Sequence, residues 1–216
     1  MIDEFLSLLP DLLIWLEKNG RVYPWRQTTD PWRVYCSEIL LQRTRGDTVE
    51  TVYDDFFGQF PHDEALYSAA DEEIREIIEP LGFGNQRTRT LREVAELVHV
   101  EHDGDFPDSE NELKKPWRVG PYSARATLIF AFNRALSLVD SNFARVLSRF
   151  SGCELPNQPH KSDSVYRVFD GLVPSDPGLA RSFNLALLDL GAMVCTPSSP
   201  HCRACPLSAG CCSSHI

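Results

Sequence analysis

A single carboxylate in a basic stretch is the first feature of this 216-residue sequence that could support catalysis. Asp140 is the one acidic residue between positions 113 and 149. The basic residues of the stretch are Lys114, Lys115, Arg118, Arg125, Arg134, Arg145 and Arg149. An isolated acid among cations, at the start of a predicted helix, indicates an active-site carboxylate that meets a polyanion. The competing interpretation is that Asp140 only caps the helix beginning near Phe143.

Glu38 is a second acid in unusual surroundings. It lies in the segment 36–41 (CSEILL), within an otherwise apolar helical pattern. Burial raises the pKa of a carboxyl, so a buried Glu38 would stay protonated and could act as a general acid. The alternative is a solvent-facing position, which is usual for a glutamate in a helix.

Four cysteines near the C-terminus have a spacing typical of a metal centre. Cys195, Cys202, Cys205 and Cys211 follow the pattern C-x6-C-x2-C-x5-C. Four thiolates this close in sequence can enclose a [4Fe-4S] cluster or a tetrahedral zinc ion. Because Cys212 directly follows Cys211, either residue could supply the fourth ligand.

Helical periodicity runs through most of the chain and predicts an all-α fold. We expect helices at 5–16, 32–43, 48–57, 63–69, 71–78, 88–99, 110–113, 123–132, 162–169 and 177–194, and another that begins at Phe143. No convincing run of alternating apolar and polar residues indicates a strand. We expect helix 32–43 and the turn at 119–121 to lie opposite each other across a groove.

The turn Val119-Gly120-Pro121 separates two helical patterns. Backbone N–H groups at such a turn, together with the positive end of the following helix dipole, can bind a phosphate. Lys114 and Lys115 lie just upstream and add positive charge. An ordinary corner between two helices explains the same pattern. The turn therefore indicates a phosphate-binding site only when it is considered together with Asp140 and the C-terminal cysteines.

With these features together, the sequence resembles the helix–hairpin–helix base excision DNA glycosylases. Residues 119–132 (VGPYSARATLIFAF) and 139–149 (VDSNFARVLSR) are similar to the helix–hairpin–helix and Gly/Pro…Asp core of that superfamily. It includes endonuclease III and the adenine and thymine glycosylases of A/G and T/G mismatches, and the likeness extends from about residue 23 to residue 211. One departure concerns the hairpin, which in the family reads Leu-Pro-Gly-Val-Gly. Arg118 replaces the first glycine, so either the hairpin bends differently or the arginine adds a charge contact.

The resemblance implies two helical lobes with a cleft between them. Residues 29–135 would form a helical barrel domain, with the helix–hairpin–helix at about 113–132. Residues 1–28 and 136–216 would form an iron–sulfur cluster domain, with the cluster loop at 195–211. The cysteine spacing is that of the iron–sulfur glycosylases, which favours a [4Fe-4S] cluster as cofactor. A zinc module without any role on DNA is the alternative.

The resemblance assigns catalytic roles to Asp140, Glu38 and Tyr122. Cleavage of an N-glycosidic bond builds positive charge on the sugar, and Asp140 would stabilise that charge or activate water. Glu38 lies in a segment, residues 37–44, that is similar to the helix carrying the catalytic glutamate of mismatch glycosylases. Tyr122 occupies the position of the lysine that forms a Schiff base in bifunctional members. Because tyrosine has no amine, we expect a monofunctional enzyme that leaves an abasic site.

The resemblance also predicts which residues contact DNA. Gln42, Arg43 and the loop 83–87 would fill the space left when the target base is flipped out of the duplex. The predicted contacts are Gln42, Arg43, Asn85, Gln86, Arg118, Val119, Gly120, Tyr122 and Arg145. Adenine glycosylases tend to carry aromatic residues in this loop and an additional C-terminal domain. Asn85-Gln86, and a sequence that stops just after its cysteines, therefore favour a mispaired pyrimidine as the substrate.

The resulting hypothesis is a monofunctional DNA glycosylase of base excision repair that removes thymine or uracil opposite guanine. One alternative is an adenine glycosylase that acts on A opposite G or 8-oxoguanine. A second alternative is a non-catalytic DNA-binding paralogue that keeps the scaffold, which the altered hairpin and the net negative charge would suit.

The formal net charge of −10 argues against a protein that coats nucleic acid indiscriminately. It does not exclude a DNA enzyme, because the distribution of the charge matters more than its sum. Acids predominate up to residue 80, whereas bases collect at 87–92 and 113–149. No apolar segment approaches 18 residues and residues 1–4 are acidic, so we expect neither a membrane span nor an export signal. We expect a cytoplasmic, nucleoid-associated monomer whose partner is double-stranded DNA containing a mismatched base.

Overall fold

The computed structural model describes residues 2–214 and confirms the all-α prediction, because no strand occurs among these residues. The chain divides into two compact units, which are described separately. Unit 1 consists of Met1–Arg21 and Asn133–Ile216, and unit 2 consists of Val22–Phe132. No helix in the described part of the chain is long and apolar enough to cross a membrane.

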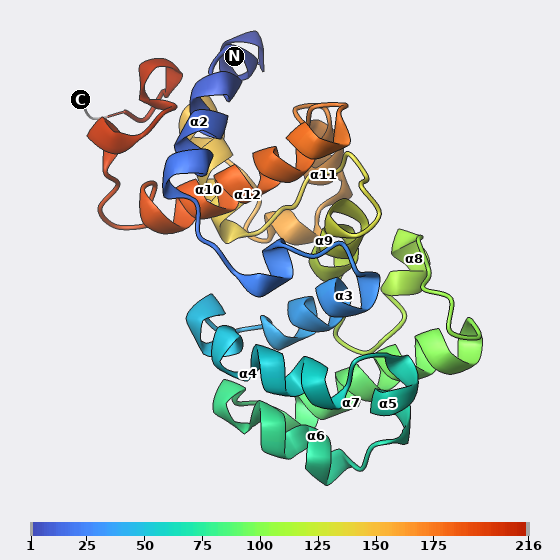
Figure 1. Cartoon of the computed structure of the whole chain (residues 1–216). Coiled ribbons are helices and arrows are strands. Elements are labelled where there is room, and N and C mark those ends of the chain that lie inside the picture. Colours follow the sequence, from blue (N-terminus) through green and yellow to red (C-terminus); the bar gives the residue numbers. More distant parts are fainter. Residues whose placement is uncertain (1, 215–216) are drawn as a thin grey trace. The chain divides into compact units, whose positions relative to one another are not determined.

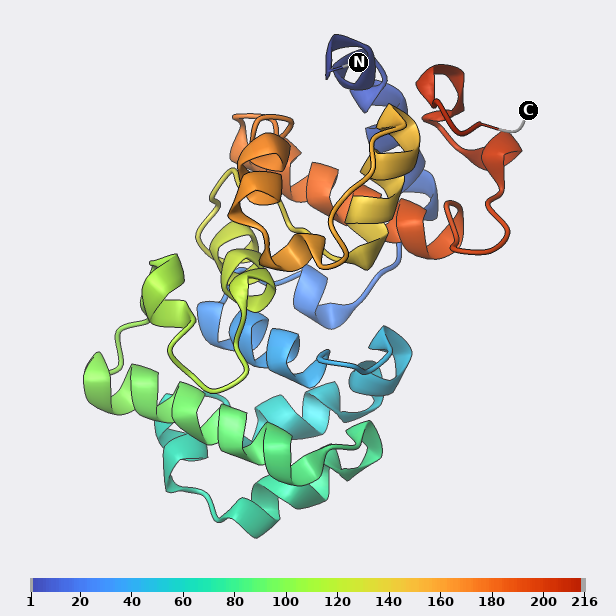
Figure 2. The same cartoon turned by 180° about the vertical axis from the view of Figure 1, so that it is seen from behind.

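Unit 2 is a bundle of mostly short helices. Its α-helices are α3 (Pro31–Leu40), α4 (Gly46–Gln59), α5 (Asp63–Ser68), α6 (Asp71–Ile78), α7 (Gly84–Glu96), α8 (Glu110–Leu113) and α9 (Pro121–Phe130). Short 3-10 turns at Pro24–Arg26 and Glu79–Leu81 and a π-helical turn at Leu97–Glu101 complete it. α3 packs against α9 and α7, and α7 also contacts α5 and α6, as Figure 2 shows for the long green helix α7.

Local sequence signals determine where α3 begins, and its apolar residues are buried. The Asp30 carboxylate accepts hydrogen bonds from the backbone N–H groups of Trp32 (2.9 Å) and Arg33 (3.3 Å). Pro31 suits the first turn, where an N–H would have no partner within the helix. Most of the helix from Trp32 onward is buried, which places Glu38 in the interior of unit 2. The apolar sequence around Glu38 therefore predicted its burial correctly.

Unit 1 combines both ends of the chain. Its α-helices are α1 (Ile2–Ser7), α2 (Leu9–Asn19), α10 (Ser141–Ser151), α11 (Asp163–Asp170) and α12 (Pro177–Met193). α12 packs against both α10 and α2, and these three helices lie together in Figure 1. The aromatic rings of Phe5, Phe143, Phe150 and Phe183 contact one another within the core of this unit.

Several helix ends differ from the sequence-based expectation. The predicted helix 5–16 is interrupted at Leu8, because Pro10 lacks the N–H that a continuous helix needs and its ring would crowd the preceding turn. α3 ends at Leu40, so Gln42 and Arg43 follow the helix. α7 begins at Gly84, so Asn85 and Gln86 belong to the first turn of a helix instead of a loop.

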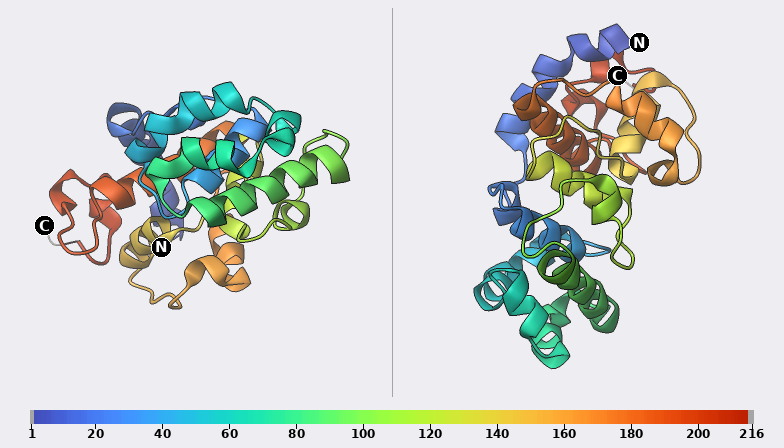
Figure 3. Two further views of the ribbon diagram at one scale, coloured as in Figure 1. Left: turned by 90° about the horizontal axis from the view of Figure 1, so that it is seen from below. Right: turned by 90° about the vertical axis from the view of Figure 1, so that its right-hand side faces the viewer.

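Between α12 and residue 214, where the described chain ends, there is no further α-helix. Two 3-10 turns, Cys202–Ala204 and Ser208–Gly210, lie within the cysteine-containing segment. Figure 3 shows this segment in red, continuing from the end of α12. With so little regular hydrogen bonding, the segment depends on other contacts for its shape.

Candidate active site and nucleic-acid interface

Asp140 caps the N-terminus of α10 and its carboxylate is fixed by two donors. Its Oδ1 accepts a hydrogen bond from the Phe143 backbone N–H (2.7 Å), and its Oδ2 accepts one from the Asn142 side-chain amide (3.0 Å). Burial raises the pKa of Asp140 above its ordinary value, while these hydrogen bonds oppose the rise. The carboxyl is thus partly desolvated yet held in one orientation, which suits a group that stabilises developing positive charge.

Arg145 joins the turn that carries Asp140 to the rest of unit 1. Its guanidinium donates to the Asn142 side-chain oxygen (2.7 Å), the Gly191 carbonyl (2.6 Å) and the Cys195 carbonyl (2.8 Å). Gly191 of α12 lies so close to α10 that a Cβ there would approach the Asn142 Cβ to 2.6 Å. The position of Asp140 therefore depends on α12 as well as on its own helix.

Glu38 is a buried carboxyl without a hydrogen-bond partner for one of its oxygens. Its side chain is 6% exposed, and Oε2 is buried and unpaired. Desolvation raises the pKa of Glu38 to about 8, and Arg26 opposes this shift electrostatically. At neutral pH the group is therefore mostly protonated, as a general acid must be.

The hairpin before α9 keeps its turn although an arginine replaces the first glycine of the family pattern. Arg118 has a φ of 62°, in the left-handed region that costs an L-residue about 1 kcal/mol. Gly120 is the N-cap of α9, Pro121 begins the helix, and Tyr122 lies in its first turn. Arg118 thus adopts a backbone conformation that favours glycine, and its side chain adds contacts that glycine cannot make.

One pocket of unit 2 brings most of the predicted DNA contacts together. The pocket has a volume of about 320 Å³ and lies among the residues after α3, the start of α7 and the hairpin. The predicted contacts that line it are Gln42, Arg43, Gln86, Arg118, Gly120 and Tyr122. Asn85 and Val119 do not line it: the Asn85 side chain accepts a hydrogen bond from Arg75 (3.3 Å), and Val119 is buried. Arg145 belongs to unit 1.

One face of α7 holds the hairpin in place. Gln86, Arg89 and Glu93 share this face because they are separated by three and four residues. Gln86 Oε1 accepts from the Arg118 guanidinium, and the Arg89 guanidinium lies 4.5 Å from the centroid of the Trp117 ring. The Glu93 carboxylate accepts from the Trp117 backbone N–H at 2.6 Å.

Arg87, which the sequence placed among the residues that fill the gap left by the flipped base, lines the same pocket but is buried and bonded within unit 2. It is 4% exposed, and its guanidinium donates to backbone carbonyls of the segments 39–42 and 81–82 and to the Thr44 hydroxyl. Burial lowers the pKa of Arg87. The side chain thereby links the segments 39–44 and 81–82, which lie next to the pocket, and few of its N–H groups remain to bind DNA.

The basic stretch is less positive than its sequence indicates, because nearby acids neutralise part of it. Lys114 and Arg125 both pair with Glu110, at 3.3 and 3.1 Å. Lys115 pairs with Glu101 (2.9 Å) and Glu112 (2.6 Å). These acids lie outside the stretch 113–149, so the sequence of the stretch alone does not reveal the pairing.

The four cysteines surround a cavity of about 290 Å³ in unit 1, lined by Cys195, Cys202, Cys205 and Cys211. Cys212 is exposed and does not line it. Among the described residues, the only group of three or more potential ligand atoms lying within 4.8 Å of one another is Glu101, His102 and Glu112, which includes no cysteine.

The cysteine cavity is tied to the helix that carries Asp140. Arg149 of α10 donates to the Cys195 sulfur (3.4 Å) and to the Thr196 carbonyl (2.7 Å). The Cys211 sulfur lies 3.5 Å from the Arg149 carbonyl. Burial raises the pKa of the Cys205 thiol to about 11, so a bound metal must compete with protons for this sulfur.

Two residues that position the candidate groups were not predicted from the sequence. Asn142 fixes Asp140 Oδ2, and the spacing Asp-x-Asn at a helix start was an available signal for this contact. Trp117 contacts the guanidinium groups of Arg89 and Arg118. The only signal in the sequence for this positioning role was that Trp117 directly precedes Arg118.

Comparisons with known proteins agree with this arrangement. Residues 36–167 match the family model of the HhH-GPD superfamily base excision DNA repair proteins. The chain is 36% identical to a thymine-DNA glycosylase of Aeropyrum pernix and 33% identical to a thymine/uracil-DNA glycosylase of Methanothermobacter thermautotrophicus. These alignments cover 93% of this chain in both cases, and 91% and 90% of the two relatives. A solved structure of a thermostable thymine-DNA glycosylase superposes with a TM-score of 0.90 at 31% identity, covering 98% of this chain and 96% of that one.

Proposed function

Because the chain belongs to the HhH-GPD superfamily of base excision DNA repair proteins, we propose that it is a monofunctional DNA glycosylase that removes thymine or uracil mispaired with guanine. Glu38 carries the proposal: a buried, protonated carboxyl lies at the position that the family resemblance assigns to the catalytic acid. The relatives named for thymine and uracil support the choice of base.

In the proposed mechanism the two carboxyls have different roles. Glu38 donates its proton to the departing base, so that the base leaves without negative charge. Asp140 remains ionised and stabilises the positive charge that develops on the deoxyribose. Water then completes the hydrolysis and leaves an abasic site. Tyr122 has no amine with which to form a Schiff base, so the DNA strand stays intact.

Base release from a set of duplexes that differ only in the mismatched pair tests this proposal. End-labelled duplexes with T/G, U/G, A/G and A/8-oxoguanine pairs are incubated with the protein, with and without alkali afterwards. We expect breaks in the T/G and U/G duplexes only after alkali. Breaks without alkali would contradict the role assigned to Tyr122, and release from the adenine duplexes alone would favour the adenine glycosylase alternative. An Asp140→Asn variant that binds mismatched DNA, beside a parent that releases no base, would favour the non-catalytic paralogue.

We also propose that Cys195, Cys202, Cys205 and Cys211 hold a [4Fe-4S] cluster. The cavity that all four residues line supports this assignment, because it gives the four thiols one shared space, and the C-x6-C-x2-C-x5-C spacing favours the cluster over zinc. The cluster would fix the segment 195–211, which contains almost no regular secondary structure. The domains expected from the sequence are part of this proposal: a barrel at 29–135 and an iron–sulfur domain at 1–28 and 136–216, in a monomer that acts on double-stranded DNA.

Metal analysis of two adjacent variants tests the cluster assignment. Protein with the parent sequence should contain iron and acid-labile sulfide in equal amounts, and Cys211→Ser should lose most of both. Cys212→Ser is the matched control and should keep them, because Cys212 is exposed and outside the cavity. Zinc in place of iron, or loss of iron from Cys212→Ser alone, would contradict the assignment.

A further inference from the structure

The pocket next to the hairpin has an unusual concentration of strained backbone. In the described part of the chain five residues other than glycine have a positive φ, and three of these line the pocket: Arg43 (58°), Phe83 (54°) and Arg118 (62°). This conformation is unfavourable for residues with side chains, and it persists where the surrounding structure enforces it, often at functional sites. The walls of the pocket are therefore held in a fixed geometry.

Arg118 contacts both glutamines of the pocket, once through its side chain and once through its backbone. Its guanidinium donates to Gln86 Oε1, and its carbonyl accepts from Gln42 Nε2 at 3.3 Å. A guanidinium can only donate and a carbonyl can only accept, so each contact dictates which end of the amide faces Arg118. Gln86 is left with its NH2 group as a donor, and Gln42 is left with its side-chain oxygen as an acceptor.

Other contacts keep this arrangement in place. The Arg118 guanidinium lies 5.0 Å from the centroid of the Trp117 ring, which also contacts Arg89. The buried Arg87 donates to the Gln42 carbonyl at 2.8 Å and so holds the backbone that carries the second glutamine. The two glutamine amides therefore have defined orientations before any ligand binds.

We propose that Arg118 is a positioning residue that fixes the hydrogen-bond polarity of Gln42 and Gln86, so that the pocket selects guanine as the base opposite the excised one. The proposal rests on the proposed function, which supplies the mismatched duplex. Guanine presents an N1–H donor, which matches the Gln42 oxygen, and an O6 acceptor, which matches the Gln86 amide. Adenine presents an acceptor at N1 and a donor at N6, so its polarity is reversed at both places. Such a pocket disfavours a thymine or uracil that is correctly paired with adenine.

Binding to duplexes without a cleavable base tests the proposal separately from catalysis. The probe is a duplex with a tetrahydrofuran abasic-site analogue opposite guanine or opposite adenine, and the measured quantity is the ratio of the two Kd values. Arg118→Gly keeps the backbone carbonyl and suits the left-handed φ, but it removes the guanidinium that orients Gln86. We expect the preference for guanine to fall about tenfold, the discrimination expected of a well-placed hydrogen-bonding pair.

A second variant replaces the hydrogen-bond donor that residue 86 presents to guanine with an acceptor, whereas Arg118→Gly only frees the Gln86 amide to rotate. In Gln86→Glu, Arg118 still binds the side chain, but a carboxylate oxygen replaces the NH2 donor that faces guanine O6. We expect the guanine preference to fall at least as far as in Arg118→Gly. The double variant should have no lower preference than Gln86→Glu alone, because both changes act through the same side chain.

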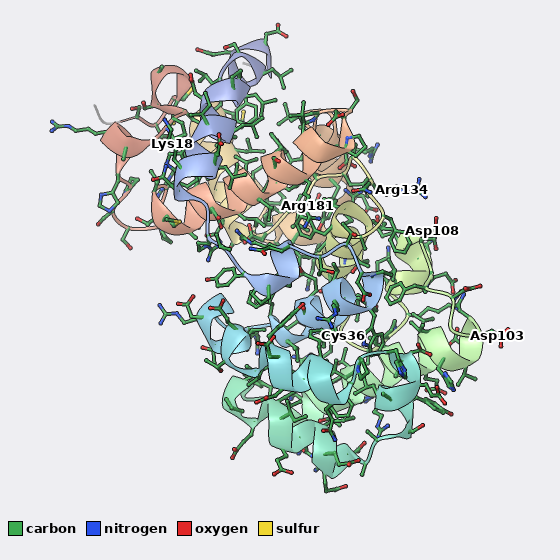
Figure 4. The ribbon with its side chains drawn as sticks, in the orientation of Figure 1. Lys18, Cys36, Asp103, Asp108, Arg134 and Arg181 are labelled. Carbon is green, nitrogen blue, oxygen red and sulfur yellow. The ribbon has the colours of Figure 1, made fainter. Side chains whose placement is uncertain are left out.

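Asp103→Gly is the matched control for placing glycine at a left-handed position. Asp103 has a φ of 52°, is exposed and does not line the pocket, and it is labelled in Figure 4. This variant should keep the parent's guanine preference. The Tm of Arg118→Gly should not fall, because glycine relieves the backbone conformation, so lost preference at an intact Tm separates positioning from unfolding.

Two results would overturn the proposal. The first is an unchanged guanine preference in Arg118→Gly. The second is an equal loss of affinity for both duplexes together with a salt dependence reduced by about one phosphate contact, which would make Arg118 a backbone contact only. A parent that prefers guanine but excises no thymine or uracil would refute the proposed function and leave this inference standing. If the parent excises uracil opposite guanine but Arg118→Gly keeps the parent's preference for guanine, the proposed function stands and this inference is refuted.

Discussion

At the scale of single residues, the two candidate carboxyls have contrasting surroundings. Asp140 receives hydrogen bonds from Phe143 and Asn142, which favour its ionised form. Glu38 has a buried oxygen with no partner, so desolvation dominates and favours its neutral form. Environments that separate the pKa values of two acids in this way assign one as general acid and the other as charged group.

The pH dependence of base release follows from this contrast. Single-turnover release should decline as the pH rises through about 8, because Glu38 then loses the proton that it donates. It should also decline at acidic pH, where Asp140 becomes protonated at a pKa above its ordinary value. Glu38→Gln should lower the rate at neutral pH by about 10²-fold or more. The variant's residual rate should lack the alkaline decline, and persistence of that decline would assign it to another group.

The same titration affects stability, and its sign can be derived. The pKa of Glu38 is raised in the folded protein, so the folded state binds the proton more tightly than the unfolded chain does. The free energy of unfolding should therefore fall as the pH rises between about 4.5 and 8. In Glu38→Gln this contribution is absent, and urea unfolding at several pH values measures the difference.

At the scale of elements, the start of α7 has two functions. Its exposed residues contact the hairpin, whereas Arg87 binds the backbone that follows α3 and precedes α7. The segments that line the pocket are therefore coupled through one buried side chain. This explains how a pocket made largely of helix ends and turns keeps a defined shape.

Removal of the Arg87 guanidinium should destabilise the protein strongly. Arg87→Met keeps an apolar stem but leaves several backbone carbonyls without their donor, so we expect a loss of about 3 kcal/mol. Urea unfolding measures the change. Arg45→Met is the control, because Arg45 is exposed. Equal stability of the two variants would mean that water satisfies the carbonyls.

Helix positions could be predicted from the sequence because the periodic pattern is local, whereas some contacts depend on tertiary structure. The burial of Glu38 followed from its apolar neighbours in α3. The burial of Arg87 could not be predicted, because arginine is rarely buried and several of its carbonyl partners come from the distant segment 39–42. The left-handed φ of Arg118 contradicts the residue's own preference, so only the resemblance to a glycine-containing hairpin pointed to it.

At the scale of the whole molecule, negative net charge and local ion pairs limit attraction to DNA. The chain has 21 lysines and arginines against 31 aspartates and glutamates. Lys114, Lys115 and Arg125 near the hairpin are already paired with glutamates. Recognition must therefore depend on a few well-placed contacts more than on a broad positive surface.

The salt dependence of DNA binding should reflect this charge distribution. We expect the affinity for a T/G duplex to fall by less than about 10³-fold between 50 and 200 mM salt, the lower limit for proteins with many phosphate contacts. Fluorescence anisotropy at several salt concentrations gives the slope. A steeper fall would show that the lysines exchange their glutamate partners for phosphates on binding.

The close crossing at Gly191 has a consequence for mutational surveys. A side chain at this position would displace the Asn142 backbone and with it the turn that presents Asp140. Screens that score only repair activity would therefore count residue 191 among the active-site positions, although its role is to provide space behind a neighbouring helix. Variants at such a position would be misclassified as active-site variants unless the packing of the helices is considered along with contact to the substrate.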